Sequence, residues 1–587
     1  MIKEAVYHRP KNEYAYAIDE KSVHIKLKTK KNDVQKVTLI FGDPYDFDSN
    51  QNSWISNSTD MWFNGSDDLH DYWIAKVTTK HRRLRYGFLL ENPIQSIYYT
   101  ERGFYKKAPS DASYYFCFPY INKVDIFSPP DWVSSTVWYQ IFPERFANGN
   151  PSINPKNSLP WNSRRPSQKS YYGGDFQGIM DKLDYIASLG VTGLYLTPIF
   201  KAHSNHKYDT IDYMEIDPQF GDKDTFKKLV QKCHAKGIKV MLDAVFNHSG
   251  LYFPPFQDVI KNGDNSPYKD WFHLHNLPLK TDFLANYDTF GYVPTMPKLN
   301  TENKEVKAYL LNVAKYWIEE FDIDGWRLDV ANEVDHAFWR DFRKVVKEAK
   351  PDAYILGEVW HDAMPWLLGD QFDAVMNYPL TTAITEYFTT NNINKAEFMN
   401  SVNKILNMYP ETINSVQFNL LGSHDTARIL TLSNSNKEKV KLQMLMQFTM
   451  PGTPCIYYGD EISMEGGEDP DCRRCMIWEE KKQDKEMLGF VKKIISLRKQ
   501  FKVFRTNNNF AFLSPKDRNN IISFTKSIAD QELLVVLNNS EFTEKFKLPN
   551  KYNQQKVLDL IMEDERTLSD TISLPSYGFA VYLIEKK

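Results

Sequence analysis

The sequence predicts an α/β protein built around a (β/α)8 TIM barrel, and three observations support this prediction. Between residues 136 and 461, short apolar runs typical of buried parallel strands alternate with amphipathic helical segments. Eight such runs are present, which is the number of strands in a closed barrel of this kind. Before about residue 125 and after about residue 506, apolar and polar residues alternate instead, as in antiparallel strands.

Length and charge limit the possible classes of protein. At 587 residues the chain is too long for a single hydrophobic core, so we expect several domains. The formal net charge of -3 gives no reason to expect nucleic acid or an acidic membrane surface as a partner. No stretch reaches the roughly 20 apolar residues that span a membrane, and residues 1–6 do not begin a signal peptide. We therefore expect no nucleic acid and no membrane as partner.

The cysteines indicate the compartment. There are five, Cys117, Cys233, Cys455, Cys472 and Cys475, and an odd number at irregular spacing favours reduced thiols. Cys472 and Cys475 have the spacing of a redox or zinc pair, but no second pair accompanies them. We interpret this spacing as incidental and predict a cytoplasmic protein.

Residues 1–125 form the first predicted domain, a β-sandwich resembling a carbohydrate-binding module. Residues 22–28 alternate apolar and polar side chains, and residues 71–77 and 85–90 follow as further short strands. Several strands of this length, separated by turn residues, predict a sandwich of about seven strands. Ser128-Pro129-Pro130 marks the linker that follows.

The barrel occupies residues 126–247 and 302–506. Its helices have a clear apolar stripe: Phe226, Leu229, Val230 and Cys233 follow the helical period, and Gly237 stands at the stop position. The eight candidate strands are residues 136–143, 191–199, 238–246, 323–331, 353–360, 372–379, 415–425 and 453–461.

Two further segments complete the domain organisation. Residues 248–301 interrupt the alternation after the third strand, and a loop of this length inside a compact domain is usually functional. We expect it to form a small inserted domain B at the C-terminal mouth of the barrel. Residues 507–587 contain alternating strands again and predict a C-terminal antiparallel β-domain.

The fourth strand carries the first candidate catalytic group. In a strand, Arg327 and Asp329 share one face, while Leu328 and Val330 point the other way. An arginine beside an aspartate keeps the carboxylate ionised and in place, as nucleophilic attack on a sugar carbon requires. An isolated pair of this kind is more often a structural ion pair, so the interpretation depends on the other strand ends.

Three other strands also end in polar residues. The third ends at Asn247-His248, the fifth at Gly357-Glu358 and the seventh at Ser423-His424-Asp425. Glycoside cleavage needs one charged and one protonated carboxyl group. Glu358 has no basic neighbour in the sequence and precedes Val359-Trp360, so we expect an apolar setting that keeps it protonated. Asp425 and the two histidines would bind sugar hydroxyls.

These segments resemble a known family. Asp243-Ala-Val-Phe-Asn-His248, Gly325-Trp-Arg-Leu-Asp-Val-Ala-Asn-Glu333, Gly357-Glu-Val-Trp360 and Leu420-Leu-Gly-Ser-His-Asp425 look like the signature regions of the α-amylase family of glycoside hydrolases, in the family's order. Met296-Pro-Lys-Leu-Asn300 resembles the region that marks its neopullulanase, cyclomaltodextrinase and maltogenic amylase subgroup. The resemblance covers essentially the whole chain.

The resemblance implies roles for individual residues. Asp329 matches the nucleophile, Glu358 the acid/base and Asp425 the third carboxylate. Tyr208 is expected to stack on the sugar to be cleaved, and Trp360 to contact the acceptor side. The full set of implied substrate contacts is His206, Tyr208, His248, Arg327, Trp360, His424, Asp469 and Arg473, the last two pairing at the closed end of the cleft.

The resemblance also implies a structural Ca²⁺ site. Its ligands would be Asn148, Asn150, Asn154, Gly173 and Asp175, which offer the oxygen atoms that this cation prefers. Asn150 stands where the family often has aspartate, and Ile153 where it often has asparagine, so binding should be weaker. A hydrogen-bonded turn without metal is the alternative.

The function implied is that of a retaining α-glucan hydrolase of the cyclomaltodextrinase, neopullulanase or maltogenic amylase type. Its partners would be cyclodextrins and maltooligosaccharides with α-1,4 bonds, with pullulan and starch as further candidates. An oligo-α-1,6-glucosidase or a transglycosylase on the same scaffold is the alternative enzyme, and a non-catalytic glucan-binding protein is the alternative outside enzymes. The resemblance further implies a homodimer in which the N-terminal sandwich covers the partner's cleft.

Overall fold

A computed structural model provides the structure, which describes residues 1–587 except 51, 507, 514–518 and 587. The chain divides into two compact units, which are described in turn. One unit contains Pro129–Thr390 and Val416–Arg505, and the other contains Met1–Ser128, Asn391–Ser415 and Thr506–Lys587.

The first unit contains the barrel, whose eight parallel strands lie in the order β20-β19-β18-β17-β14-β13-β22-β21. A parallel bridge from Met376 to Phe418 joins the two ends of this sheet, so the barrel is nearly closed. The strands are β13 (Trp138–Ile141), β14 (Gly193–Leu196), β17 (Lys239–Ala244), β18 (Gly325–Leu328), β19 (Tyr354–Gly357), β20 (Ala374–Val375), β21 (Phe418–Asn419) and β22 (Thr453–Tyr457). All eight predicted strands are confirmed, each shorter than predicted.

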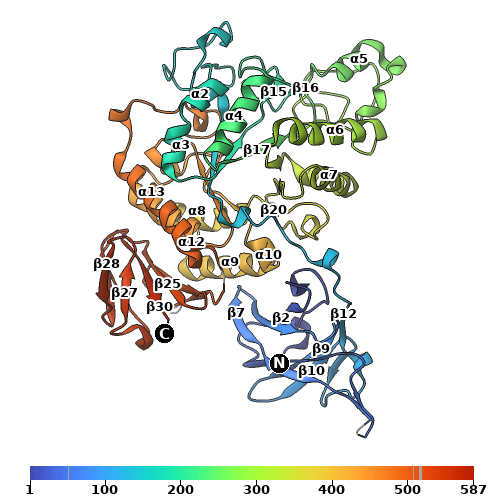
Figure 1. The fold of residues 1–587 in the computed structure, drawn as a ribbon, viewed down its shortest axis with the longest axis vertical. Helices are drawn as coiled ribbons and strands as arrows, with labels where there is room; N and C mark the ends of the chain where they lie inside the picture. Colours follow the sequence, from blue (N-terminus) through green and yellow to red (C-terminus); the bar gives the residue numbers. More distant parts are fainter. Residues whose placement is uncertain (51, 507, 514–518, 587) are drawn as a thin grey trace. The chain divides into compact units, whose positions relative to one another are not determined.

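Helices alternate with these strands and surround them, as Figure 1 shows for α2, α3, α4, α6, α7, α8, α12 and α13. Their bounds are Phe176–Asp181, Leu183–Leu189, Lys223–Ala235, Lys304–Phe321, His336–Ala349, Tyr378–Thr385, Lys437–Thr449 and Lys485–Gln500, and the short helices α1 (Pro143–Phe146) and α11 (Ile429–Leu432) lie in the loops. Helix α4 begins after Asp222, whose side chain caps it, and Gly237 follows its end with a φ of 70°. The four predicted stripe residues of α4 are buried.

The inserted segment contains α5 (Pro254–Asn262), two short 3-10 helices, Gly263–Asn265 and Lys269–Trp271, and loops that fold back on themselves. Isolated antiparallel bridges pair His248 with Lys298 and Thr289 with Pro297. Residues 296–300, singled out in the sequence, therefore run beside the end of the third barrel strand. This placement brings Met296 to the mouth of the barrel.

The second unit contains the N-terminal sandwich. Its sheets contain four and six strands, more than the seven predicted, because short polar segments such as β6 also pair. The first sheet is β1 (Ala15–Ala17), β2 (Ser22–Lys30), β8 (His70–Thr78) and β7 (Trp62–Ser66). The second is β11 (Gly103–Tyr105), β10 (Ser96–Thr100), β9 (Leu84–Glu91), β3 (Lys36–Gly42) and β6 (Asn57–Asp60), with β12 (Phe116–Phe118) beside β9, and β4 (Phe47–Asp48) pairs β5 (Ser53–Trp54) separately.

The same unit contains α9 (Lys395–Met408), α10 (Glu411–Asn414) and the C-terminal β-domain. Antiparallel strands of that domain lie side by side in Figure 1. They are β23 (Ala511–Phe512), β24 (Ile521–Ser527), β25 (Gln531–Asn538), β30 (Phe579–Glu585), β27 (Lys556–Asp559) and β28 (Asp564–Thr567), with β26 (Glu544–Lys547) and β29 (Thr571–Leu574) as a separate pair. Among the described residues, no helix combines the length and apolar character needed to cross a membrane.

Candidate active site

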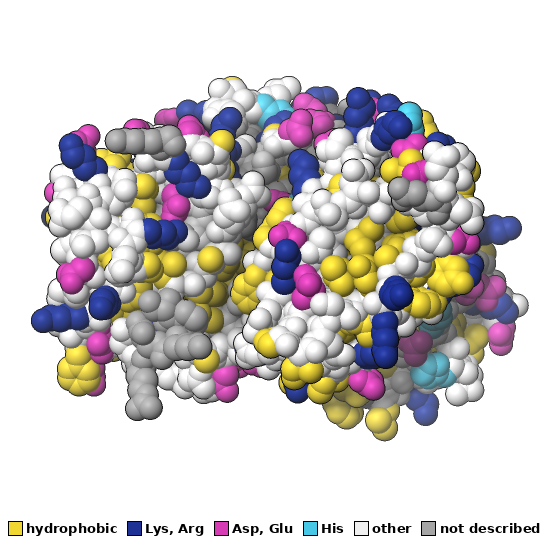
Figure 2. Space-filling model, turned by 90° about the horizontal axis from the view of Figure 1, so that it is seen from below, with side chains coloured by type: hydrophobic (Ala, Val, Ile, Leu, Met, Phe, Trp, Pro, Cys, Tyr) yellow, Lys and Arg dark blue, Asp and Glu magenta, His cyan; other side chains and the backbone are white. Residues whose placement is uncertain are grey.

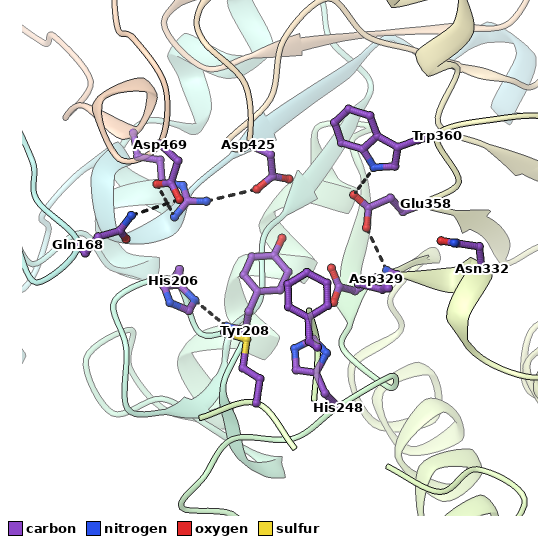
Figure 3. Close-up of a pocket in the computed structure, with 14 residues that line it drawn as sticks. Gln168, His206, Tyr208, His248, Asp329, Asn332, Glu358, Trp360, Asp425 and Asp469 are labelled. Atoms are coloured by element: carbon purple, nitrogen blue, oxygen red, sulfur yellow. Dashed lines mark hydrogen bonds and ion pairs between the residues drawn. The ribbon is translucent and has the colours of Figure 1, made fainter. Parts of the chain in front are cut away.

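A cavity of about 440 Å³ opens where the C-terminal ends of the barrel strands meet (Figure 3). Carboxyl groups, histidines and the apolar side chains of Phe290 and Met296 all line it. Its lining residues are Gln168, His206, Tyr208, His248, Phe290, Met296, Asp329, Val330, Asn332, Glu358, Trp360, Asp425, Asp469 and Arg473. The structure therefore brings the three predicted catalytic carboxyl groups to one cavity.

Arg327 lies beneath this cavity and joins the two principal carboxyl groups. Its Nη1 lies 2.8 Å from Asp329 Oδ1, and its Nη2 lies 2.8 Å from Glu358 Oε1. Nη1 also donates to both oxygens of Asp243 at 3.0 Å. The guanidinium is 1% exposed. Because a planar guanidinium binds several carboxylates in fixed directions, Arg327 fixes the relative position of Asp329 and Glu358.

The backbone turns immediately after Asp329. Strand β18 ends at Leu328, so the predicted strand to residue 331 is too long. Val330 adopts a left-handed conformation, with φ 47° and ψ 42°, which is unusual for a β-branched residue. In this conformation its N–H donates to Glu358 Oε2 at 3.0 Å, and Val330 faces the cavity rather than away from it. The prediction that Leu328 and Val330 share a face is therefore wrong.

The carboxyl groups differ from the sequence prediction in their surroundings. The expectation that Glu358 lies away from basic groups is wrong, because Arg327 reaches it from the neighbouring strand. Burial raises the pKa of Asp329 well above its ordinary value, Arg327 opposes this rise, and the carboxyl group of Glu358 adds to it. Proximity to arginine in the sequence therefore does not decide which carboxyl group is charged.

Two predicted substrate histidines are neutral hydrogen-bonding groups: His248 lines the cavity, whereas His424 is buried against Tyr208 and does not line it. His424 Nε2 lies 2.6 Å from Tyr208 Oη, and the two rings stack at 5.4 Å. Its Nδ1 lies 2.8 Å from Gln140 Nε2. Burial lowers the pKa of His424 well below its ordinary value and lowers that of His248 to about 3. His248 Nε2 is buried without a hydrogen-bond partner among the described residues, so it is free to bind a sugar hydroxyl.

Asp425 and Arg473 close one end of the cavity. Arg473 Nη2 lies 3.3 Å from Asp425 Oδ1, and its Nη1 lies 2.9 Å from Asp469 Oδ1. Arg473 also donates from Nε to the carbonyl oxygen of His424 at 2.7 Å. The predicted pairing of Asp469 with Arg473 is confirmed, and Figure 3 shows Asp469 beside Gln168. His206 lies in the same cavity, and burial lowers its pKa to about 3.

Trp360 lies at the opposite end of the cavity and is half exposed. One face of its indole stacks on Tyr378, with ring centroids 3.6 Å apart and planes within 8°. Its Nε1 donates to Glu358 Oε1 at 3.3 Å. The other face is available to a ligand, so Trp360 is suited to stack on a sugar ring.

Sequence reasoning missed several residues of the site. Asp243, Tyr195 and Gln140 support the catalytic groups from neighbouring strands, since Tyr195 donates to Asp243 at 2.6 Å. Asp243 interrupts the apolar run of residues 240–246, and a single charged residue inside such a run is a usable signal in the sequence. Phe290, which stacks on His248 at 5.1 Å, comes from the inserted domain, and nothing in its surroundings in the sequence pointed to the site.

The predicted calcium ligands fall into two groups. Asn148 and Asn154 meet beside Gly173, where an added Cβ would lie 2.3 Å from Asn154 Oδ1. Asn148 Oδ1 is buried without a hydrogen-bond partner in the described part of the chain. The free oxygen of Asn148 fits an oxygen-binding cation, whereas Asn154 Oδ1 accepts from Asn148 Nδ2 at 3.1 Å and would have to exchange this donor for the cation.

The other two predicted ligands do not fit as well. Asp175 accepts the N–H groups of Gly149, Asn150 and Gly178, the last two at 2.8 and 2.7 Å. Asn150 Oδ1 accepts from the backbone of Ser152 at 3.3 Å. Their oxygen atoms therefore already have protein partners. Among the described residues, no group of three or more His, Cys, Asp or Glu side chains could hold a metal ion.

The fold and the site together define a class of protein. A parallel (β/α)8 barrel with three carboxyl groups in one cavity at its C-terminal end is suited to carboxylate-dependent glycoside hydrolysis. The chain belongs to the α-amylase family: the model of the α-amylase catalytic domain matches residues 140–510, and that of the N-terminal Ig-like domain matches residues 1–122.

Three relatives illustrate that the similarity extends over the whole length of the chain. A cyclomaltodextrinase from Geobacillus thermopakistaniensis (strain MAS1) is 55% identical, with 100% of both chains covered. An intracellular maltogenic amylase from Bacillus subtilis is 47% identical, with 98% of both chains covered. A solved structure of a cyclomaltodextrinase is 48% identical, superposes with a TM-score of 0.95 and covers 100% of both chains.

The lowered pKa of His248 predicts a loss of stability in acid. The folded pKa is about 3 and the ordinary value is 6.5, so the unfolded chain binds the proton more tightly. Stability should therefore fall as the pH drops below 6.5, by about 2 kcal/mol at pH 5 for this one residue. In thermal unfolding, His248→Gln should show a smaller loss of Tm between pH 7.5 and 5 than the wild type. His203→Gln, at an exposed position, is the control. An equal loss in His248→Gln would contradict the prediction.

Proposed function

We propose that the protein hydrolyses α-1,4-glucosidic bonds of cyclodextrins and maltooligosaccharides with retention of configuration, with pullulan and starch as further substrates. One observation carries this proposal: Asp329 and Glu358 bind the same buried guanidinium and face one cavity. The relatives named cyclomaltodextrinase and maltogenic amylase support the choice of substrate. Retention predicts that the two carboxyl groups lie about 5–5.5 Å apart.

In the first step, Asp329 attacks the anomeric carbon. Its Oδ2 has no hydrogen-bond partner among the described residues, so this oxygen is available to form the new bond. Three carboxyl groups surround the single positive charge of Arg327, and full ionisation would bury a net negative charge. Asp329 has to be ionised to attack, so Glu358, the other cavity carboxyl group on Arg327, is the group that gives a proton to the departing glycosidic oxygen.

In the second step, Glu358 takes a proton from water, and the water oxygen replaces Asp329 at the anomeric carbon. Trp360 and the Val330 N–H hold the Glu358 carboxyl group in place through both steps. Asp425 and His248 would bind hydroxyls of the sugar ring, with Tyr208 stacked against it, and His424 would hold Tyr208 in place through Nε2. The neutral state of His248 suits this role, since neutral imidazole both donates and accepts hydrogen bonds.

We further propose a cytoplasmic homodimer. The name "intracellular" of the Bacillus subtilis relative and the five free cysteines support the compartment. Hydrophobic side chains gather on the face drawn in Figure 2. In the N-terminal sandwich, Tyr45, Phe47 and Ile55 are at least half exposed, which suits an interface.

We propose that a Ca²⁺ ion binds weakly beside Asn148, Asn154 and Gly173. The unpartnered oxygen of Asn148 supports a site there. Both carboxylate oxygens of Asp175 already accept backbone N–H groups, and a cation at Asp175 would have to compete with these donors. With few charged ligands, the dissociation constant should lie at about 10⁻⁴–10⁻³ M.

The roles of Asp329 and Glu358 can be distinguished with two substrates whose leaving groups differ in their need for an acid. On β-cyclodextrin, Asp329→Asn and Glu358→Gln should both lower kcat/KM, the second by roughly 10²–10⁴-fold. On 4-nitrophenyl α-maltoside, whose leaving group needs no acid, Glu358→Gln should still release nitrophenol in a rapid burst, whereas Asp329→Asn should not. Stopped-flow absorbance measures this burst.

The control is Asp370→Asn, since Asp370 is an exposed partner of Arg340 outside the cavity, and its rates should stay within two-fold of the wild type. Loss of the burst in Glu358→Gln, or its survival in Asp329→Asn, would reverse the assigned roles. Proton NMR of the first product should show the α-anomer, and a β-anomer would exclude retention.

Sedimentation tests the homodimer. The intact protein should sediment at twice the chain mass, and a protein that lacks residues 1–128 should sediment as a monomer, because the interface is assigned to the N-terminal sandwich. A monomer mass for both proteins would contradict the dimer. A dimer for both would move the interface elsewhere.

Calcium binding can be tested without measuring activity. Adding 5 mM CaCl₂ to protein treated with EDTA should raise Tm by roughly 1–3 °C, since a ligand stabilises by its mass action on the folded state. Asn148→Ala should remove this rise. No rise in the wild type would support the metal-free turn.

A further inference from the structure

Another cavity of the barrel unit, of about 310 Å³, lies where the barrel strands begin. Thr136 stands shortly before β13 and Thr192 just before β14, while Lys239 is the first residue of β17. Because the strands are parallel, their starts lie at the end of the barrel opposite to the catalytic carboxyl groups. The volume falls at the lower end of the range of ordinary ligand sites, roughly 300–1,000 Å³. The cavity is therefore separate from the active site and large enough for a small ligand.

This cavity is basic. Its cationic side chains are Lys239, Lys499 in the last turn of α13, and Arg505 at the end of the 3-10 helix Lys502–Arg505. None of the described residues that line it is acidic, and the other lining residues are Trp132, Ser135, Thr136, Thr192 and Gly237. Three positive charges from distant segments at one cavity repel one another unless an anion lies between them.

Arg505 has hydrogen-bonding capacity that the protein does not use. It is half-buried, yet its guanidinium forms no hydrogen bond or ion pair within the described part of the chain. Burial lowers the pKa of Arg505 below its ordinary value, and no described carboxylate opposes this effect. Removing a guanidinium from water without giving it a partner is costly, so an acceptor in the cavity would stabilise it.

The two lysines also keep free donors. Lys499 Nζ donates to the carbonyl oxygen of Gly190 at 3.2 Å, and no acid pairs with it among the described residues. Lys239 Nζ lies 3.0 Å from Asp324 Oδ1, but Lys350 Nζ lies 2.9 Å from the same oxygen. One carboxylate oxygen therefore serves two ammonium groups. Because an ammonium group has three N–H donors, both cavity lysines can bind a further acceptor.

The neutral part of the wall fits an anion better than a free sugar. Thr192 Oγ1 accepts the N–H of Val137 at 3.2 Å, which leaves its own O–H to donate. Trp132 is held in place because its Nε1 donates to the carbonyl oxygen of Asp352 at 2.9 Å. Lys239 Nζ lies 5.3 Å from the centre of the Trp132 ring, so a cation lies over this ring where a sugar would have to stack. A neutral sugar would also leave the three cations without a counter-charge.

We propose that this basic cavity binds a phosphate group, either as inorganic phosphate or on a sugar phosphate. A phosphate monoester carries about −1.5 to −2 charges at pH 7 and three acceptor oxygens. The guanidinium of Arg505 can bind two of these oxygens side by side, while Lys239 and Lys499 supply point charges. The bound group would join the end of α13 to the starts of the barrel strands. It would therefore stabilise the barrel without taking part in glucan cleavage.

Calorimetric titration of the intact protein tests this site. Inorganic phosphate, in a buffer kept at constant ionic strength with potassium chloride, should bind at one site per chain. Glucose 6-phosphate should compete for the same site, and glucose should not. Tighter binding of glucose 6-phosphate than of inorganic phosphate would make a sugar phosphate the ligand, whereas equal or weaker binding would make inorganic phosphate the ligand.

Variants show whether the cavity holds the phosphate. Arg505→Gln and Lys499→Gln should each weaken binding by about ten-fold or more, because each loses a hydrogen bond to a charged group. Lys499 is exposed, so its replacement should leave folding intact. The matched control is Lys502→Gln, since Lys502 is an exposed cation of the same 3-10 helix that does not line the cavity. This control should bind phosphate within about two-fold of the wild type.

Two results would overturn the site. One is the absence of binding by both phosphate compounds. The other is equal weakening in Lys502→Gln and Arg505→Gln, which would show attraction to the general surface charge instead of a site. Either result would leave the proposed function standing, because that function is tested with other residues at the opposite end of the barrel.

Discussion

The buried guanidinium of Arg327 is the interaction on which the rest of the site depends. Its charge is surrounded by carboxyl groups from three neighbouring strands, Asp243 on β17, Asp329 after β18 and Glu358 after β19. Asp243 and Arg327 are direct partners in the register of the parallel sheet. Because each strand supplies one polar residue at the same level, the barrel places these groups together without help from flexible loops.

Two features of this arrangement make unfavourable contributions to the free energy of the folded state. Burial raises the pKa values of Asp243 and Asp329, so the folded state opposes full ionisation of the group. Val330 is held in a left-handed conformation, at a cost of about 1–3 kcal/mol. Both contributions serve the same geometry, since the N–H of Val330 and the side chain of Arg327 bind different oxygens of Glu358. The packing of the surrounding barrel stabilises a backbone conformation and a cluster of buried charges that would not form without it.

Substrate contacts are added around this centre from segments distant in sequence. Phe290 and Met296 come from the inserted domain, Trp360 rests on Tyr378, and Arg473 reaches across to Asp425.

The sequence by itself determined the eight strands, the helix α4 with its stripe and stop, and the strand ends that carry Asp329, Glu358 and Asp425, because periodicity and strand-end polarity are local properties. It could not show that Arg327 forms an ion pair with Glu358, that the backbone turns at Val330, or that backbone N–H groups donate hydrogen bonds to Asp175. These features depend on contacts between segments, such as neighbouring strands in register. The groups that pack around a carboxyl group determine whether it is charged, and they also determine whether a predicted metal ligand has a free oxygen. Only the tertiary structure decides which groups these are.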